Sequence, residues 1–129
     1  MAITSKNYVE NVLRTESIDF DAIIKRLSDK DIIRLLHADM GICTESGELT
    51  DALKKFIFYG KEVDRINVIE EAGDLMWYIG LLVDALGITL DEVMTKNIAK
   101  LSTRYPDKFT VRAALNRDLE SERGVLEEK

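Results

Sequence analysis

The chain has 129 residues and a formal net charge of -6, with 46% hydrophobic and 33% charged residues. This length suits one domain with a buried core, and the apolar share excludes a disordered chain. The acidic balance disfavours DNA or RNA as a partner, and the single cysteine excludes a disulfide-rich secreted fold.

The N-terminal segment MAITSKNYVENVLR lacks the apolar stretch that a signal peptide needs. No uncharged run reaches the length of a membrane span, since Asp84 interrupts the longest apolar window. We therefore expect a cytoplasmic protein that binds neither a membrane nor nucleic acid.

The periodicity of apolar residues predicts an all-α fold, an antiparallel bundle of about four to five helices. No segment has the alternation of a β-strand together with a hairpin signal. We expect one domain over residues 1–129, with a metal-binding core at about 30–110. The expected helices cover residues 4–14, 29–58, the span from Asp64 to Leu86, the span from Thr89 to just before Pro106, and 112–127, with a short helical piece near 20–27.

Capping residues and glycines give the expected helix ends and irregularities. Ser28 opens a sequence that resembles a capping box for the long second helix. Asp64 and Thr89 are the expected caps of the next two helices. Gly41 and Gly47 fall inside the long helix, where a glycine marks either a bend or a close contact with a neighbouring helix.

Four acidic residues lie on or beside the apolar stripes of two predicted helices. Residues three and four apart share a helix face, which places Glu45 with Glu48, and Glu71 with Asp74, toward the interior. Buried carboxylates without partners are very unfavourable and raise one another's pKa. One such pair alone is usually a solvated surface pair, but two pairs on adjacent helices favour a divalent cation, Mg²⁺ or in its place Mn²⁺.

The residues around these acids resemble the motifs of the all-α nucleoside triphosphate pyrophosphatases, the MazG-like superfamily. Segments 37–48 and 70–78 are similar to its two metal motifs, and segment 97–106 is similar to a third element. The resemblance implies Mg²⁺-dependent cleavage of a nucleoside triphosphate between the α and β phosphates, giving a monophosphate and pyrophosphate. It implies that the four acids hold the metal, and that Glu48 or Glu71 takes the proton of the attacking water.

Six further residues are candidate substrate contacts, and each has a structural alternative. Asn97 lies on an apolar stripe where the family has a nucleotide- or metal-contacting asparagine, although a structural hydrogen bond would also explain it. Tyr78 follows Asp74 by one helical turn, so it either stacks on a base or fills the core. Cationic side chains on helices either bind phosphates or form a solvated face. The candidates are Asn97, Lys100, Arg104, Tyr78, His37 and Lys54.

Three hypotheses remain open. The first is the pyrophosphatase, acting on a deoxynucleotide in house-cleaning, on dUTP or dCTP, or on phosphoribosyl-ATP. The second is a di-iron carboxylate bundle, which the single histidine disfavours because such sites need two. The third is a non-catalytic interaction protein that keeps a metal for structure. The resemblance also implies a homodimer or homotetramer, in which segment 112–127 packs on a partner subunit or on its own bundle.

Overall fold

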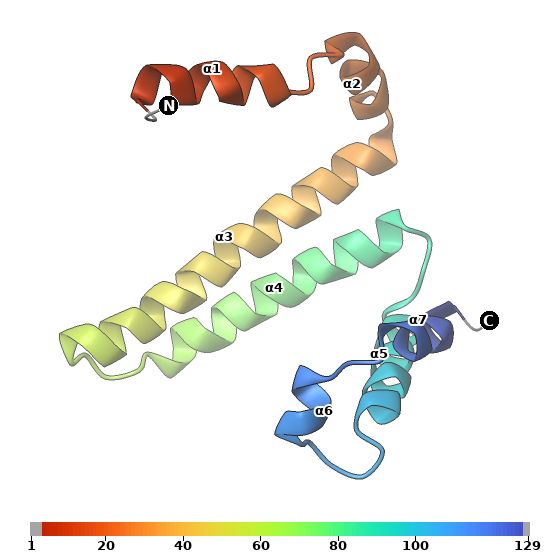
Figure 1. Cartoon of the computed structure of the whole chain (residues 1–129). Helices are drawn as coiled ribbons and strands as arrows, with labels where there is room; N and C mark the ends of the chain where they lie inside the picture. Colours follow the sequence, from red (N-terminus) through yellow and green to blue (C-terminus); the bar gives the residue numbers. More distant parts are fainter. Residues whose placement is uncertain (1–3, 128–129) are drawn as a thin grey trace. The chain divides into compact units, whose positions relative to one another are not determined.

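The computed structural model describes residues 4–127, and every regular element among them is an α-helix (Figure 1). The all-α prediction is confirmed, with seven helices in this part of the chain in place of the four to five expected. In chain order the helices are α1 Ser5–Thr15, α2 Phe20–Leu27, α3 Lys30–Tyr59, α4 Arg65–Ala85, α5 Leu90–Arg104, α6 Val111–Leu115 and α7 Leu119–Glu127.

The chain divides into two compact units. The first extends to Ile33 and holds α1, α2 and the first turn of α3, while the second begins at Arg34 and holds the remaining helices. The prediction of one domain over residues 1–129 stays a prediction. Within the described range no single helix has the length and apolarity to cross a membrane, although α4 and α5, bent by 99° at their junction, pass that test as a pair.

The cap of α3 lies one residue later than the sequence predicted. Asp29, and not Ser28, accepts hydrogen bonds from the first turn, at 2.8 Å from the Asp31 N–H and 3.4 Å from the Ile32 N–H. Ser28 instead ends α2, where its hydroxyl donates to the carbonyl of Ile24 at 2.9 Å. A carboxylate next to the hydroxyl accepts from the backbone equally well, which explains the shift.

A tight turn joins α3 to α4. Gly60 takes a φ of 65°, a left-handed conformation that suits glycine, and lets the Lys61 N–H donate to the Lys55 carbonyl at 3.2 Å. Asp64 caps α4 as predicted, because its carboxylate accepts from the N–H groups of Ile66 and Asn67, both at 3.1 Å. This turn sends α4 back along α3.

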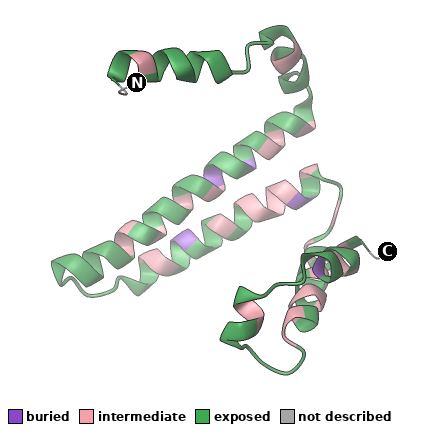
Figure 2. Cartoon of the chain, viewed as in Figure 1, coloured by how far each residue is buried: buried purple, intermediate pink, exposed green. Residues whose placement is uncertain are grey.

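The two long helices run antiparallel, so early residues of α3 meet late residues of α4 (Figure 1). Arg34 forms an ion pair with Asp84 at one end of the pair. Ala38 and Val83 are the buried apolar side chains of the described residues, and most other large apolar side chains are exposed (Figure 2). The helix pair is therefore thin, and its closure into a bundle stays a prediction.

The prediction of one continuous helix over residues 112–127 is wrong, because the segment forms α6 and α7 with a break between them. Asn116 ends α6, and its amide donates to the Arg112 carbonyl at 2.8 Å. Asp118 then accepts from both the backbone N–H and the hydroxyl of Ser121, at 3.0 and 2.8 Å. Polar side chains that bond to nearby backbone compete with the helix, and here they restart it.

Packing of α7 on α5 depends on a buried carboxylate. Glu122 is 3% exposed and accepts from Arg104 Nε at 2.8 Å and from Arg117 Nη2 at 2.7 Å. Lys96 adds a hydrogen bond of 2.7 Å to the carbonyl of Leu126. The cationic face of α5 therefore holds the C-terminal helix.

Acid should loosen this contact. The arginines, Arg104 foremost and then Arg117, lower the pKa of Glu122 from its ordinary 4.5 to about 2. A lowered folded-state pKa stabilises the fold above pH 4.5, and that stabilisation is lost as the pH falls toward 2. We expect Glu122→Gln to unfold more readily than wild type at pH 7, and the difference in free energy of unfolding to shrink toward pH 2–3. A difference that stayed constant with pH would contradict this account.

Candidate metal centre

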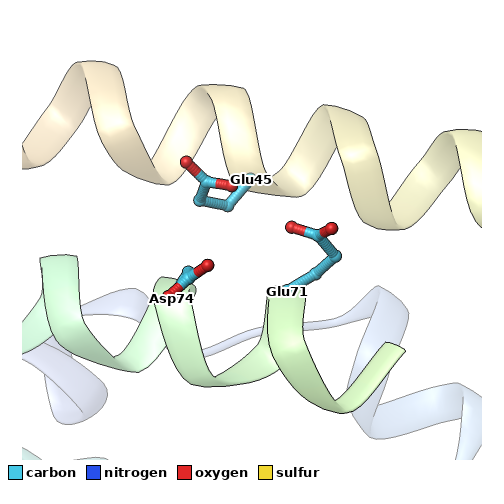
Figure 3. Close-up of side chains that lie close together, drawn as sticks. All are labelled: Glu45, Glu71 and Asp74. Carbon is cyan, nitrogen blue, oxygen red and sulfur yellow. The ribbon is translucent and has the colours of Figure 1, made fainter. Parts of the chain in front are cut away.

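Three of the four predicted metal ligands come together between α3 and α4. Glu45 of α3 faces Glu71 and Asp74 of α4 (Figure 3). One carboxylate oxygen from each residue lies within 4.8 Å of the other two. Glu71 is 4% exposed, Glu45 is half-buried and Asp74 is exposed. The spacing of three within α4 puts both of its acids on the face toward α3, as the sequence predicted.

Glu48, the remaining predicted ligand, lies outside this group of three. It lines a neighbouring cavity of about 520 Å³ with Thr44, Gly47, Asp51, Lys55 and Asn67. Its charge still acts on the centre, since it contributes to the raised pKa of Glu71. Its role as a metal ligand stays a prediction.

Burial and charge make ionised Glu71 unfavourable when no cation is bound. Burial is the largest cause of its raised pKa, and the charges of Glu48 and Glu45 raise the pKa further. Asn67 acts in the opposite direction, because its side-chain amide donates to Glu71 Oε1 at 2.6 Å. The hydrogen bond from Asn67 therefore only partly offsets the effects that raise the pKa of Glu71.

The donor set fits a hard divalent cation. None of the ion pairs found among residues 4–127 involves Glu45, Glu71 or Asp74. Carboxylate oxygens from two facing helices are the ligands that Mg²⁺ and Mn²⁺ prefer. The three residues could hold such an ion after small movements of their side chains.

Asn67 is a residue of the centre that the sequence interpretation missed. Its place one helical turn before Glu71 was the available signal, because such neighbours share a face. Hydrogen bonds that orient a metal ligand typically change metal affinity by 10- to 100-fold. We expect Asn67→Ala to weaken Mn²⁺ binding by roughly tenfold or more. Titration calorimetry would measure this, and wild-type affinity in the variant would contradict it.

An aromatic group lies next to the acids. The Tyr78 ring meets the rings of His37 and Trp77 edge-on, with centroids 5.6 and 5.0 Å apart. Tyr78 also packs on Gly41, where an added Cβ would lie 2.2 Å from the ring. The prediction of a close helix contact at one of the two glycines of α3 is confirmed at Gly41. Trp77 is 59% exposed.

A cavity connects this aromatic group to the acids. It measures about 340 Å³, and its lining consists of Glu45, Asp74, Trp77 and Tyr78. Aromatic faces beside a polar centre suit the planar base of a nucleotide, which stacks on them. Tyr78 thus lies beside the acids and His37 lies against Tyr78, and substrate contacts by both residues stay predictions.

The other predicted substrate contacts lie elsewhere. Asn97 is exposed and Lys100 half-buried on α5, and Arg104 is held by Glu122. The cavities that contain the acids are lined by residues of α3 and α4. Lys54 pairs with Asp51 at 2.6 Å and lines neither cavity, whereas its neighbour Lys55 lines one of them. Substrate contacts by these residues stay predictions.

These features define a helical protein with an acidic centre between two antiparallel helices. The family model of the MazG nucleotide pyrophosphohydrolase domain matches residues 37–109, and the chain belongs to this family. It is similar to the Gene 37 protein of Mycobacterium phage L5, with 33% identity over 88 residues that cover 64% of this chain and 77% of the relative. No solved structure is matched. The matched segment contains all four predicted metal ligands.

Proposed function

We propose that this chain hydrolyses nucleoside triphosphates between the α and β phosphates in a Mg²⁺-dependent reaction that serves nucleotide-pool house-cleaning. The observation that carries the proposal is the convergence of Glu45, Glu71 and Asp74 inside the segment that matches the MazG family. A net charge of -6 would otherwise repel a triphosphate. A cation at the acidic centre offsets that repulsion.

Each part of the centre has a role in this reaction. When bound, the cation would neutralise phosphate charge and lower the pKa of a water. Water then attacks the α phosphorus, the bond to the bridging oxygen breaks, and pyrophosphate leaves with the electron pair. Glu48 is favoured over Glu71 to accept the water's proton, since a carboxylate beside a cation is a weaker base. Tyr78, Trp77 and His37 would hold the base.

A panel of nucleotides tests this proposal. Purified protein is incubated with each NTP and dNTP, and with phosphoribosyl-ATP, in the presence of Mg²⁺ or Mn²⁺, and both pyrophosphate and orthophosphate are measured. We expect equal amounts of monophosphate and pyrophosphate. Release of orthophosphate alone would contradict the site of cleavage. Metal binding without turnover of any substrate would favour the non-catalytic alternative.

We further propose that the chain forms a homodimer or homotetramer. On the face of α4 away from the acids, Ile66, Ile69 and Met76 are 80%, 72% and 62% exposed. Their spacing puts them on one face of the helix, and large exposed apolar side chains that share a face are usually covered. Light scattering should give the mass of two or four chains, and a monomer at micromolar concentration would contradict this.

A further inference from the structure

The side chains between α3 and α4 change character along the helix pair. Because the helices are antiparallel, residues later in α3 face residues earlier in α4. The facing groups are aromatic at one end and acidic in the middle, and at the other end Lys55 and Lys61 lie among carboxylates. From one end to the other, the contacts and cavities bring together Gly41 with Tyr78, Glu45 with Asp74 and Glu71, Glu48 with Asn67, and Lys55 with Asn67.

Two adjoining cavities lie at the Lys55 end of the helix pair. The first, of about 520 Å³, contains Glu48 at the edge of the acidic centre. The second, of about 290 Å³, is lined by Ala52, Lys55, Lys61, Glu62, Asp64 and Asn67. Lys55 and Asn67 line both, so the space next to the acids continues to the turn between the helices.

The Lys55 ammonium keeps N–H donors for a further partner. Asp51 accepts from Lys54 at 2.6 Å and from Lys55 at 2.7 Å, so one negative charge faces two positive charges. An ammonium group has three N–H donors, and Asp51 uses one donor of Lys55. Asp64 is engaged by the N–H groups that begin α4. Glu48, Asp51, Glu62 and Asp64 line the same cavities, so an anion would bind at Lys55 together with the divalent cation.

The position of the Lys55 ammonium suits the length of a triphosphate. Its bond to Asp51 draws the side chain back along α3 toward the acids. Asp51 follows Glu48 by three residues, which is about 4.5 Å along a helix axis. The ammonium is thus held one turn beyond Glu48, near enough for the distal phosphates of a substrate whose α phosphate lies at the acids.

We propose that Lys55, with Asn67 and Lys61, binds the departing pyrophosphate, so that the triphosphate lies along the helix pair with its base at Tyr78 and its distal phosphates at Lys55. This assignment rests on the proposed function. In this assignment Lys55 takes the substrate-binding role that the sequence analysis gave to its neighbour Lys54. A charged hydrogen bond of this kind changes affinity by about tenfold or more.

Binding of inorganic pyrophosphate to the full chain with Mg²⁺ tests the assignment. Titration calorimetry would compare wild type, Lys55→Ala and Lys54→Ala, two variants that each remove one lysine from the same aspartate. We expect Lys55→Ala to weaken pyrophosphate binding roughly tenfold, Lys54→Ala to change it less than about twofold, and both to bind the nucleoside monophosphate as wild type does. Lys61→Ala should give a smaller loss than Lys55→Ala.

Equal effects of the two substitutions, or a loss of monophosphate binding in Lys55→Ala, would overturn the assignment. So would wild-type pyrophosphate affinity in Lys55→Ala. Thermal midpoints close to wild type in both variants would show that the loss is not unfolding. Failure of the proposed function is a separate result, since wild type would then turn over no triphosphate. An active wild type with an unaltered Lys55→Ala would reject only the orientation.

Discussion

Glu71→Gln is expected to lower triphosphate hydrolysis by about a thousandfold or more, and at the same time to raise the thermal midpoint of the cation-free protein. Activity falls because one of three carboxylates that converge between the helices is lost. Stability rises because the substitution removes a buried charge whose pKa is raised by burial and by Glu48 and Glu45. Loss of activity through unfolding would give the opposite change in stability.

With a divalent cation bound, wild type should become more stable than Glu71→Gln. In wild type, Mg²⁺ at a hundredfold excess over its dissociation constant should stabilise the fold by about 2.7 kcal/mol, whereas Glu71→Gln should gain much less. Glu70→Gln is the matched control, since it removes the same charge from the neighbouring, exposed position. It should keep both activity and the response to Mg²⁺. Equal losses in the two variants would count against a specific role for Glu71.

Gly41→Ala is expected to destabilise the protein by about 1–3 kcal/mol and to raise the KM for nucleotides. The new methyl group would lie 2.2–2.3 Å from three atoms of the Tyr78 ring. The ring has little freedom to turn aside, because His37 and Trp77 flank it. Urea unfolding measures the cost, and KM measures the displacement of the ring from the proposed base site.

Gly47→Ala is the control for this substitution, because a Cβ there meets nothing within 4 Å. Alanine favours a helix over glycine, so this variant should gain about 0.5–1 kcal/mol. If Gly41→Ala lowers the free energy of unfolding while Gly47→Ala raises it, the contact of Gly41 with Tyr78 is the cause of the difference. The double variant Gly41→Ala, Tyr78→Ala should recover part of the lost stability relative to Tyr78→Ala alone. A Gly41→Ala as stable as Gly47→Ala would contradict the contact.

Local patterns predicted the helices well where neighbouring residues decide the structure. The caps at Asp64 and Thr89 are confirmed because each depends on backbone groups a few residues away. The break before α7 was missed, because the side chains of Asn116 and Asp118 that make it belong to residue types that also occur inside helices. The surface on which α7 packs stayed open, since Glu122 meets Arg104 of another helix and sequence spacing carries no information about that partner.

In the candidate site too, local spacing was predicted and contacts between helices were not. Helical spacing predicted that Glu71 and Asp74 share a face of α4 and that Glu45 lies on the inward face of α3, but it could not tell that Glu48 would line the next cavity. Adjacent residues on a helix point about 100° apart, so only the packed pair of helices distinguishes Lys55 from Lys54.

A crystal structure with Mn²⁺ tests the central claim most directly, because anomalous scattering locates the ion without assumptions about its ligands. We expect one ion between α3 and α4, with oxygens of Glu45, Glu71 and Asp74 at about 2.0–2.3 Å. Glu71→Gln crystals prepared in the same way should lack it. Wild-type crystals in millimolar Mn²⁺ with no ion at these carboxylates, or with the three side chains turned apart, would contradict the account.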